Sequence, residues 1–185
     1  MRRNGLIAIN LQEGDELDWV APTTGSDEIL IATALGKAIR FSETEVRAMG
    51  RDTQGVIGIK LGSGDSVVGM ATAVEGGDLL VITERGYGKR TPVSEYPMHH
   101  RAGQGVFTLK VTDRVGQLVA MRVVSDPEEE ILVISASGMV LRTQVGAISQ
   151  IGRQTQGVIV MRIAGDDQVV AIAPVAAIEE GDPKE

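Results

Sequence analysis

Basic side chains recur along this 185-residue sequence at a nearly constant spacing. Arg40 and Arg90 lie 50 residues apart, and Arg142 follows after a further 52. A guanidinium presents a planar fork of N–H donors that matches phosphate oxygens, and an ammonium binds the same anions as a point charge. Recurring cations of this kind predict a surface that binds phosphate groups. The candidate residues are Arg40, Arg51, Lys60, Lys89, Arg90, Arg101, Lys110, Arg142, Arg153 and Arg162.

The net charge argues against such a surface, whereas the distribution of charge along the chain supports it. The formal net charge is −7, and phosphate binding depends on Lys and Arg. Residues 37–60, 85–114 and 142–162 nevertheless hold 14 of the 18 Lys and Arg residues and only 5 of the 25 acids. If equivalent positions line up in the fold, an acidic chain can still carry a continuous basic stripe.

The same spacing extends to glycines and to whole segments, which indicates an internal repeat. Gly5, Gly55, Gly105 and Gly157 are separated by 50, 50 and 52 residues. The segments that start at positions 27, 78 and 130 each contain an acidic residue, an aliphatic run, a polar turn with glycine and a second run with arginine. The predicted organisation is half a repeat at 1–26, full repeats at about 27–77, 78–129 and 130–178, and a disordered tail at 179–185.

Each repeat has the pattern of four strands. The first repeat contains strand-like segments at residues 28–33, 38–41, 56–61 and 66–73, separated by turns rich in glycine. Residues 42–49 form at most one helical turn, and no segment has a sustained helical period. Hydrophobic residues make up 43% of the chain but aromatic residues only 3%, so the core must be aliphatic. We predict an all-β, propeller-like array of tandem four-stranded blades, about three and a half repeats long.

The sequence contains no motif typical of catalysis or metal binding. The stretch G-Y-G-K at 86–89 fails as a phosphate-binding P-loop, because Thr83 stands where glycine is needed and Arg90 where Ser or Thr is needed. His99 and His100 are the only histidines, and a metal site normally needs three or four ligands. There is no cysteine and no apolar run of membrane-spanning length. We expect no catalytic residue, no metal, no cofactor and no membrane association.

Three longer motifs resemble the C-terminal domain of the DNA gyrase A subunit. They are R-R-N-G-L-I-A-I-N-L at 2–11, I-R-F-S-E-T-E-V-R-A-M-G-R-D-T-Q-G-V at 39–56 and G-Y-G-K-R-T-P-V-S-E-Y at 86–96. The likeness runs from position 2 to about position 175 and includes the spacing as well as the motifs. It implies a β-pinwheel, a propeller-like disk of about six blades in which neighbouring blades exchange a strand. This chain resembles roughly the second half of that disk.

The resemblance also implies a function. Domains of this family wrap double-stranded DNA around a basic perimeter and support negative supercoiling, while ATP hydrolysis and DNA cleavage occur elsewhere. The implied partners are the phosphate backbone of duplex DNA, the remainder of gyrase A and the ATPase subunit. The implied location is the cytoplasm of a bacterium, on its nucleoid. By itself the module would be a non-catalytic portion of an ATP-dependent type II topoisomerase.

The sequence departs from the family pattern in two ways. The Q-R-R-G-G-K-G box of the family is absent, and its degenerate counterparts are G-R-D-T-Q-G at 50–55, H-R-A-G-Q-G at 100–105 and G-R-Q-T-Q-G at 152–157. The repeat pattern also begins in the middle of a blade. An unpaired blade edge would invite self-association with a second copy.

The alternative hypothesis is a protein-interaction module of the propeller type that does not bind DNA and uses its acidic turns as the working surface. A third hypothesis is a half-domain isolated for folding or assembly. An enzyme with its active site at the propeller centre is disfavoured, because the repeats offer no convergent polar cluster. A titration of duplex binding against salt separates the first two hypotheses, because phosphate contacts release counterions.

Overall fold

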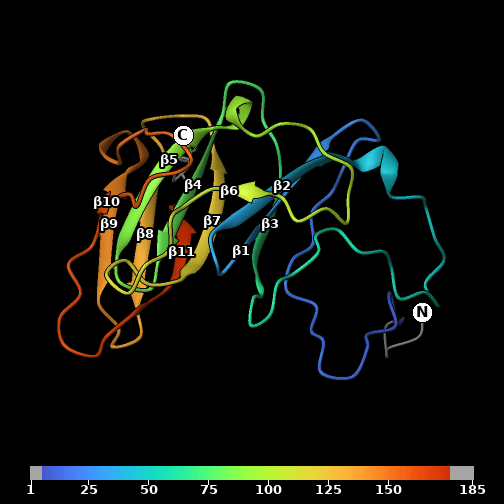
Figure 1. Cartoon of the computed structure of the whole chain (residues 1–185), viewed down its shortest axis with the longest axis horizontal. Coiled ribbons are helices and arrows are strands. Elements are labelled where there is room, and N and C mark those ends of the chain that lie inside the picture. The colour runs from blue at the N-terminus through green and yellow to red at the C-terminus, as the bar shows by residue number, and fades with distance from the viewer. Residues whose placement is uncertain (1–5, 176–185) are drawn as a thin grey trace, which may run out of the picture.

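Three antiparallel β-sheets stand side by side in the computed structural model, which describes residues 6–175 (Figure 1). Blade 1 has the strand order β3-β1-β2-β6, with β1 (Glu28–Thr33), β2 (Lys37–Ser42), β3 (Val67–Thr72) and β6 (Val106–Phe107). Blade 2 has the order β10-β5-β4-β7, with β4 (Asp78–Thr83), β5 (Tyr87–Pro92), β7 (Leu118–Val124) and β10 (Val158–Ile159). Blade 3 has the order β11-β8-β9, with β8 (Glu130–Ser135), β9 (Val140–Gln144) and β11 (Val169–Pro174).

The helical content of the described chain is limited to one short 3-10 turn after the second strand of each repeat. These turns are η1 (Glu43–Glu45), η2 (Val93–Glu95) and η3 (Val145–Ala147). Within residues 6–175 no helix has the length and apolar character that crossing a membrane requires. The predicted all-β architecture is confirmed, and so is the prediction of no more than one helical turn at residues 42–49.

Neighbouring blades exchange a strand, as the family resemblance implied. Strand β6 follows β5 in the chain but pairs with β2 of the preceding blade, where Val106 lies opposite Ala38. In the same way β10 pairs with β5, where Val158 lies opposite Gly88. The outer strands of blades 1 and 2 thus come from the next repeat, so the second and third repeats each complete the sheet of the preceding one.

A glycine in the first hairpin turn of a repeat lets the exchanged strand cross. Gly86 has a φ of +77°, and a Cβ atom there would overlap the carbonyl oxygen of Met161. Its own carbonyl accepts hydrogen bonds from the backbone N–H groups of Val160 and Met161 at 2.9 and 3.1 Å. Gly36 makes the equivalent contact with Leu109. The turn therefore needs a residue that tolerates both a positive φ and a close backbone approach.

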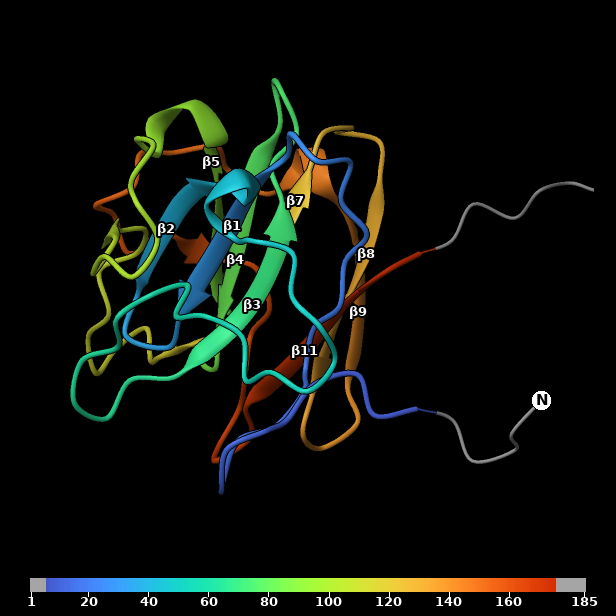
Figure 2. The same ribbon diagram turned by 90° about the vertical axis from the view of Figure 1, so that its right-hand side faces the viewer.

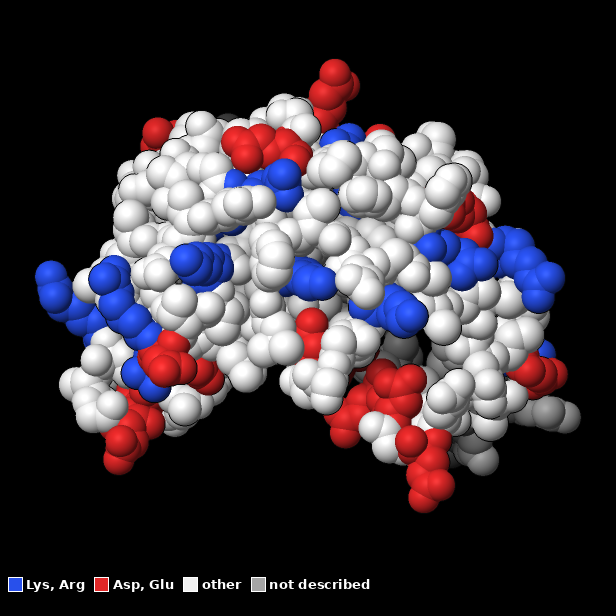
Figure 3. All heavy atoms as spheres, viewed as in Figure 1, with Lys and Arg blue, Asp and Glu red and all other residues white. Residues whose placement is uncertain are grey.

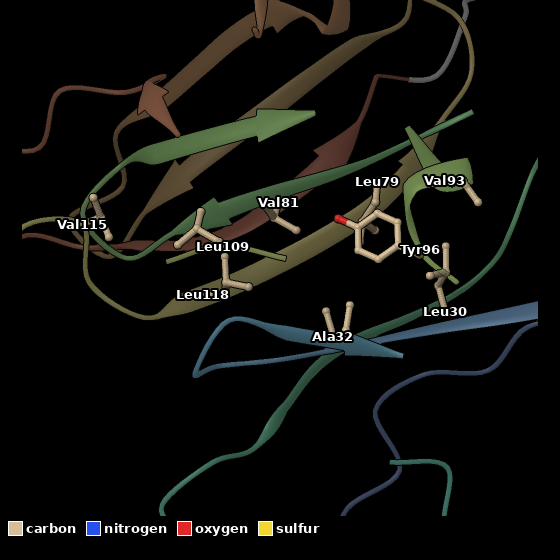
Figure 4. Packing of buried hydrophobic residues seen from close by; sticks show 10 residues of the cluster. Leu30, Ala32, Leu79, Val81, Val93, Tyr96, Leu109, Val115 and Leu118 are labelled. Carbon is tan, nitrogen blue, oxygen red and sulfur yellow. The ribbon is translucent and has the colours of Figure 1, made fainter. Parts of the chain in front are cut away.

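Most of the aliphatic core fills the two spaces between adjacent blades, where β4 contributes to both, and a smaller cluster lies on blade 1. Leu79 and Val81 pack with Leu30 of blade 1 in one cluster, and Figure 4 shows these side chains in the same space as the ring of Tyr96. Leu80 and Ile82, on the opposite face of β4, pack in a second cluster that includes residues of β8. Figure 2 shows blade 2 between its neighbours. This position explains why all six residues of β4 are buried.

The predicted strand at residues 56–61 does not form. This segment is equivalent to β6 and β10, and it is mostly exposed, with Ile57 64% accessible. Its counterparts pair with the second strand of the preceding blade, and no such strand lies beside it within the described part of the chain. The edge of β9 is likewise unpaired there, with Val140 58% accessible. Self-association through this edge stays a prediction, and the tail predicted at 179–185 lies outside the described residues.

Candidate nucleic-acid interface

The first row of predicted cations, Arg40, Arg90 and Arg142, is paired with acids of the same blades. Each acid begins the first strand of the hairpin, and each arginine lies on the second strand. Arg90 Nη1 lies 2.7 Å from Asp78 Oδ2, and Arg40 and Arg142 form ion pairs with Glu28 and Glu130. The hydrogen bond from Arg142 lowers the pKa of Glu130, and the pKa of Arg142 is raised in return.

Two of these arginines also connect successive repeats. Arg40 Nη1 donates to the carbonyl oxygens of Val93 and Tyr96, both at 3.1 Å. Arg90 Nε donates to the carbonyl oxygen of Ile148 at 2.8 Å. The side chains of Arg40 and Arg90 are only 19% and 15% accessible, whereas that of Arg142 is 60% accessible. Arg40 and Arg90 are therefore largely enclosed by structural partners, whereas the side chain of Arg142 is mostly exposed.

The second row is Arg51, Arg101 and Arg153, in the loops that resemble the family box. Arg101 Nη1 donates to the carbonyl of Ile57 and Arg153 Nη1 to that of Phe107, both at 3.2 Å. Ile57 and Phe107 occupy equivalent positions, so each arginine reaches back to the preceding repeat in the same way. Arg51 is exposed and has no hydrogen bond or ion pair with any described residue. The loops thus place their arginines at the junctions between blades.

The third row is the most accessible one. Lys60, Lys110 and Arg162 are exposed, each a few residues beyond the glycine that starts the crossing segment. Their side chains make no hydrogen bond or ion pair with residues 6–175. The backbone of the first two is held where it meets the next loop. The N–H of Lys60 donates to Gly103 O at 2.8 Å, and that of Lys110 to Thr155 O at 3.0 Å. Three open cationic side chains, two of them on fixed backbone, suit contact with phosphates.

The structure corrects the prediction for Lys89, because this side chain is 0% accessible. Its ammonium donates to the carbonyl oxygens of Gly152 and Arg153, both at 2.6 Å, and to Thr155 Oγ1 at 3.0 Å. An enclosed ammonium whose three N–H groups all have protein partners cannot reach a phosphate. We therefore remove Lys89 from the candidate interface.

Exposed arginines outside the predicted set include two that lie close together. Arg85 and Arg114 line a polar hollow together with Arg162, beside the ring of Tyr87. The guanidinium of Arg114 lies 5.3 Å from the centre of that ring. Each of these arginines occurs in one repeat only, so a search for recurring positions passes over them. The only signal in the sequence is their place within the basic window 85–114.

Figure 3 shows how the charges are distributed over one face of the molecule. Lys and Arg form a band across the middle of this face, from one end of the row of blades to the other. Asp and Glu gather above and below the band. The whole chain is acidic, yet this face carries a cationic path that can neutralise several phosphates in succession.

Asp167, in one of the predicted acidic turns, and Asp65, in the equivalent turn of blade 1, hold their turns together. Asp167 accepts hydrogen bonds from the hydroxyl and the backbone N–H of Ser137, at 2.6 and 2.9 Å. Asp65 accepts from the N–H of Leu35 in the equivalent turn of blade 1, at 2.9 Å. The hydrogen bonds from Ser137 and Ser135 lower the pKa of Asp167 to about 2. These carboxylates are occupied within the fold, which leaves fewer for a protein partner.

Fold and surface together define the class of this protein. It is a tandem-repeat module of the β-propeller type, with strands exchanged between blades and a cationic band along one face. The chain belongs to the family described as DNA gyrase C-terminal domain, beta-propeller, whose model matches residues 1–24, 27–73, 77–125 and 129–176. These four matched segments overlap the half repeat and the three full repeats, one segment for each.

Curated relatives carry the same assignment. The DNA gyrase A subunit of Halalkalibacterium halodurans is 59% identical over 175 residues, which is 95% of this chain and 21% of that protein. The DNA gyrase A subunit of Escherichia coli K12 is 47% identical over 176 residues, which is 95% of this chain and 20% of that protein. The chain thus spans about a fifth of the length of these relatives.

Solved structures show the same fold. A DNA gyrase A C-terminal domain matches with a TM-score of 0.81 and 30% identity, over 93% of this chain and 58% of that one. A C-terminal domain of DNA topoisomerase IV matches with a TM-score of 0.85 and 26% identity, over 91% of this chain and 52% of that one. The chain therefore corresponds to rather more than half of such a domain.

Proposed function

We propose that this chain is a non-catalytic module that binds and wraps double-stranded DNA as part of a bacterial type IIA topoisomerase, DNA gyrase A, and so supports negative supercoiling. The observation that carries the proposal is the third row of cations. Lys60, Lys110 and Arg162 are exposed at equivalent places in three repeats, without acidic partners in the described chain. They are available to a polyanion, and the band in Figure 3 offers it successive cationic groups across the face.

Duplex DNA fits this surface better than a single strand does. Proteins that bind single strands stack bases on exposed aromatic rings, and only Trp19 and Phe107 expose large aromatic side chains here, 39% and 52% accessible. The ring of Phe107 already lies 5.7 Å from the ammonium of Lys37. Contacts from Lys and Arg to phosphates position a duplex without reading its bases. Any sequence preference would then come from how easily the DNA bends.

The partners we propose follow from the coverage of the relatives. Because the chain spans about a fifth of gyrase A proteins, we propose that the remainder of gyrase A, with the ATPase subunit, supplies DNA cleavage and ATP hydrolysis. The proposed location is the bacterial cytoplasm, on the nucleoid. Within residues 6–175 there is no group of three or more potential metal ligands, and the module's proposed role requires no metal of its own.

Removing the third row tests the proposal. Replacing Lys60, Lys110 and Arg162 together by Gln should weaken binding to every duplex sequence alike. The slope of log affinity against log salt should also become shallower by about 2 to 3 units, because each lost phosphate contact removes about 0.9. Fluorescence anisotropy with a labelled duplex at several salt concentrations measures both quantities.

Single substitutions provide a matched control. Lys110→Gln should reduce the slope by about 0.9, whereas Arg122→Gln should leave it unchanged, because Arg122 already pairs with Glu129 at 3.1 Å. A slope near zero in the wild type would refute phosphate binding. It would favour the alternative, a protein-interaction module that uses the acidic turns not already engaged by the fold.

A further inference from the structure

Lys89 is the one wholly buried cation of the described chain, and the arrangement of its surroundings is specific. Its three contacts all lie in residues 152–155, which we call the Arg153 loop. On the same strand, Thr91 Oγ1 donates to the carbonyl of Ile151 at 2.8 Å. Side chains of β5, in the second repeat, thus hold the loop that precedes β10, in the third repeat. This linkage adds to the β5–β10 ladder. Burying a charge is costly unless it is fully hydrogen-bonded, so these contacts call for an explanation.

The other two blades do not use this device. The residues equivalent to Lys89 are Ile39 in blade 1 and Leu141 in blade 3. Ile39 is fully buried in an apolar cluster. A blade can therefore fold with an aliphatic side chain at this position. A charged residue at the same place in blade 2 serves something other than the packing of the sheet.

The loop that Lys89 holds carries a predicted DNA-binding residue. The Arg153 guanidinium donates to Phe107 O at 3.2 Å and lies 5.9 Å from the Tyr96 ring. Thr155 O also accepts the backbone N–H of Lys110 at 3.0 Å, which joins the loop to the backbone of the preceding repeat. Lys89 contacts the loop from inside the molecule, where no solvent reaches its side chain, whereas Arg153 is partly exposed.

We propose that Lys89 is a positioning residue for this part of the DNA-binding surface: its buried ammonium holds the Arg153 loop so that Arg153 is fixed at the junction between repeats. The proposal rests on the proposed function and adds to it the residue that organises one segment of the band. Lys89 makes no contact with DNA itself. Its effect on binding passes through Arg153.

The electrostatic setting agrees with this role. Burial lowers the pKa of Lys89 to about 8, Glu95 opposes the shift and Arg153 adds to it. Lys89 is therefore still charged at neutral pH, and its hydrogen bonds to the loop are charge-assisted. Glu95 belongs to η2 and Arg153 to the loop itself. The positive charge of the Lys89 ammonium is therefore compensated by a carboxylate of the protein.

The first experiment measures the loop directly. Lys89→Met keeps the length of the side chain and removes its three hydrogen bonds, and Ile39→Met is the matched control at the equivalent position of blade 1. Amide hydrogen exchange of residues 152–157 should become roughly tenfold or more faster in the Lys89 variant, because each lost bond to a charged group weakens the closed state. Exchange of β4 should be unchanged, which shows that the blade still folds. If Met reduces the protection of β4 as well, Lys89→Leu replaces it, because blade 3 has leucine at this position.

The second experiment is a double-mutant cycle on duplex affinity with Lys89→Met and Arg153→Ala. Each single substitution should weaken binding by roughly three- to tenfold. The double variant should bind DNA at most about twofold more weakly than Arg153→Ala alone, because Lys89 acts only through Arg153. A merely structural lysine would instead add its effect to that of Arg153→Ala.

The outcomes separate the two proposals. Unchanged exchange in the loop overturns the role of Lys89, and so does additivity in the cycle. If neither substitution alters affinity but the triple replacement of Lys60, Lys110 and Arg162 does, DNA binding stands and the positioning role falls. If the triple replacement also leaves affinity unchanged, the proposed function and its extension are both overturned.

Discussion

At the scale of single residues, equal spacing conceals unequal roles. Arg40 and Arg90 recur with the same period as Lys60 and Lys110, yet the first two are enclosed by acids and carbonyls and the last two face solvent. Lys89 is the extreme case, a cation with no access to solvent. The charge of a side chain alone therefore does not decide whether it stabilises the blades or contacts a ligand.

The buried charge of Lys89 should appear in the pH dependence of stability. Its pKa is lowered to about 8 in the folded protein, from 10.5 for an ordinary lysine. Between these values the unfolded chain binds more protons than the folded chain, so the free energy of unfolding should rise as the pH increases from about 8 to 10. Urea unfolding should show this rise in the wild type and a smaller one in Lys89→Met.

A second buried group, Tyr96, changes the stability of both proteins above pH 10. Burial raises the pKa of Tyr96 to about 12. Above pH 10 the unfolded chain loses this phenolic proton before the folded chain does, so stability falls there in both proteins. Identical slopes below pH 10 would contradict a buried, charged Lys89.

At the scale of the strands, the exchange between blades makes every junction depend on a backbone crossing. Gly86 and Gly138 both have positive φ, +77° and +87°, and lie in equivalent hairpin turns just before β5 and β9. They differ in what lies next to them. A Cβ atom on Gly86 would overlap Met161 O, whereas nothing lies within 4 Å of one on Gly138. The pair separates the cost of a left-handed backbone from the cost of blocking the crossing.

Alanine at each glycine makes this comparison quantitative. Gly138→Ala should lower the free energy of unfolding by about 1 kcal/mol, the cost of a left-handed conformation in an ordinary residue. Gly86→Ala should lower it by about 1 to 3 kcal/mol more, because β10 must move away from β5. Urea denaturation measures both values. Equal losses would show that the exchanged strand can adapt without loss of stability.

At the scale of the whole molecule, the three blades form an arch, and the cationic band follows its length (Figures 1 and 3). A straight duplex can contact only part of an arched molecule, so contact along the whole arch requires the DNA to bend. Smooth bending of a site of 20 to 30 base pairs by 40° to 90° costs on the order of 1–6 kcal/mol. DNA that is already curved avoids part of this cost.

Curved DNA should therefore bind more tightly than straight DNA of the same length and base composition. We expect a preference of at least about fivefold, which corresponds to about 1 kcal/mol of bending energy. Competition between an intrinsically curved duplex and a straight one measures it. The triple Gln variant should lose the preference together with the affinity. Equal affinity of the wild type for both duplexes would mean that the band binds DNA without bending it.

The sequence by itself determined the all-β class, the number of repeats, most strand positions and the windows in which the cations lie. These features depend on local alternation, on turn residues and on spacing, all of which are written along the chain. The segment at 56–61 shows the limit, because its strand pattern is intact but a strand also needs a neighbour to pair with.

Only the tertiary structure decided which cations are available. Lys89, Arg90 and Arg101 meet oxygens that lie 44 to 64 residues away in the chain, and no local pattern reports such partners. Exchange of β6 and β10 between blades brings those oxygens into place. A buried, satisfied lysine and an exposed one have the same letter and the same spacing, and they differ only in what the folded chain places around them.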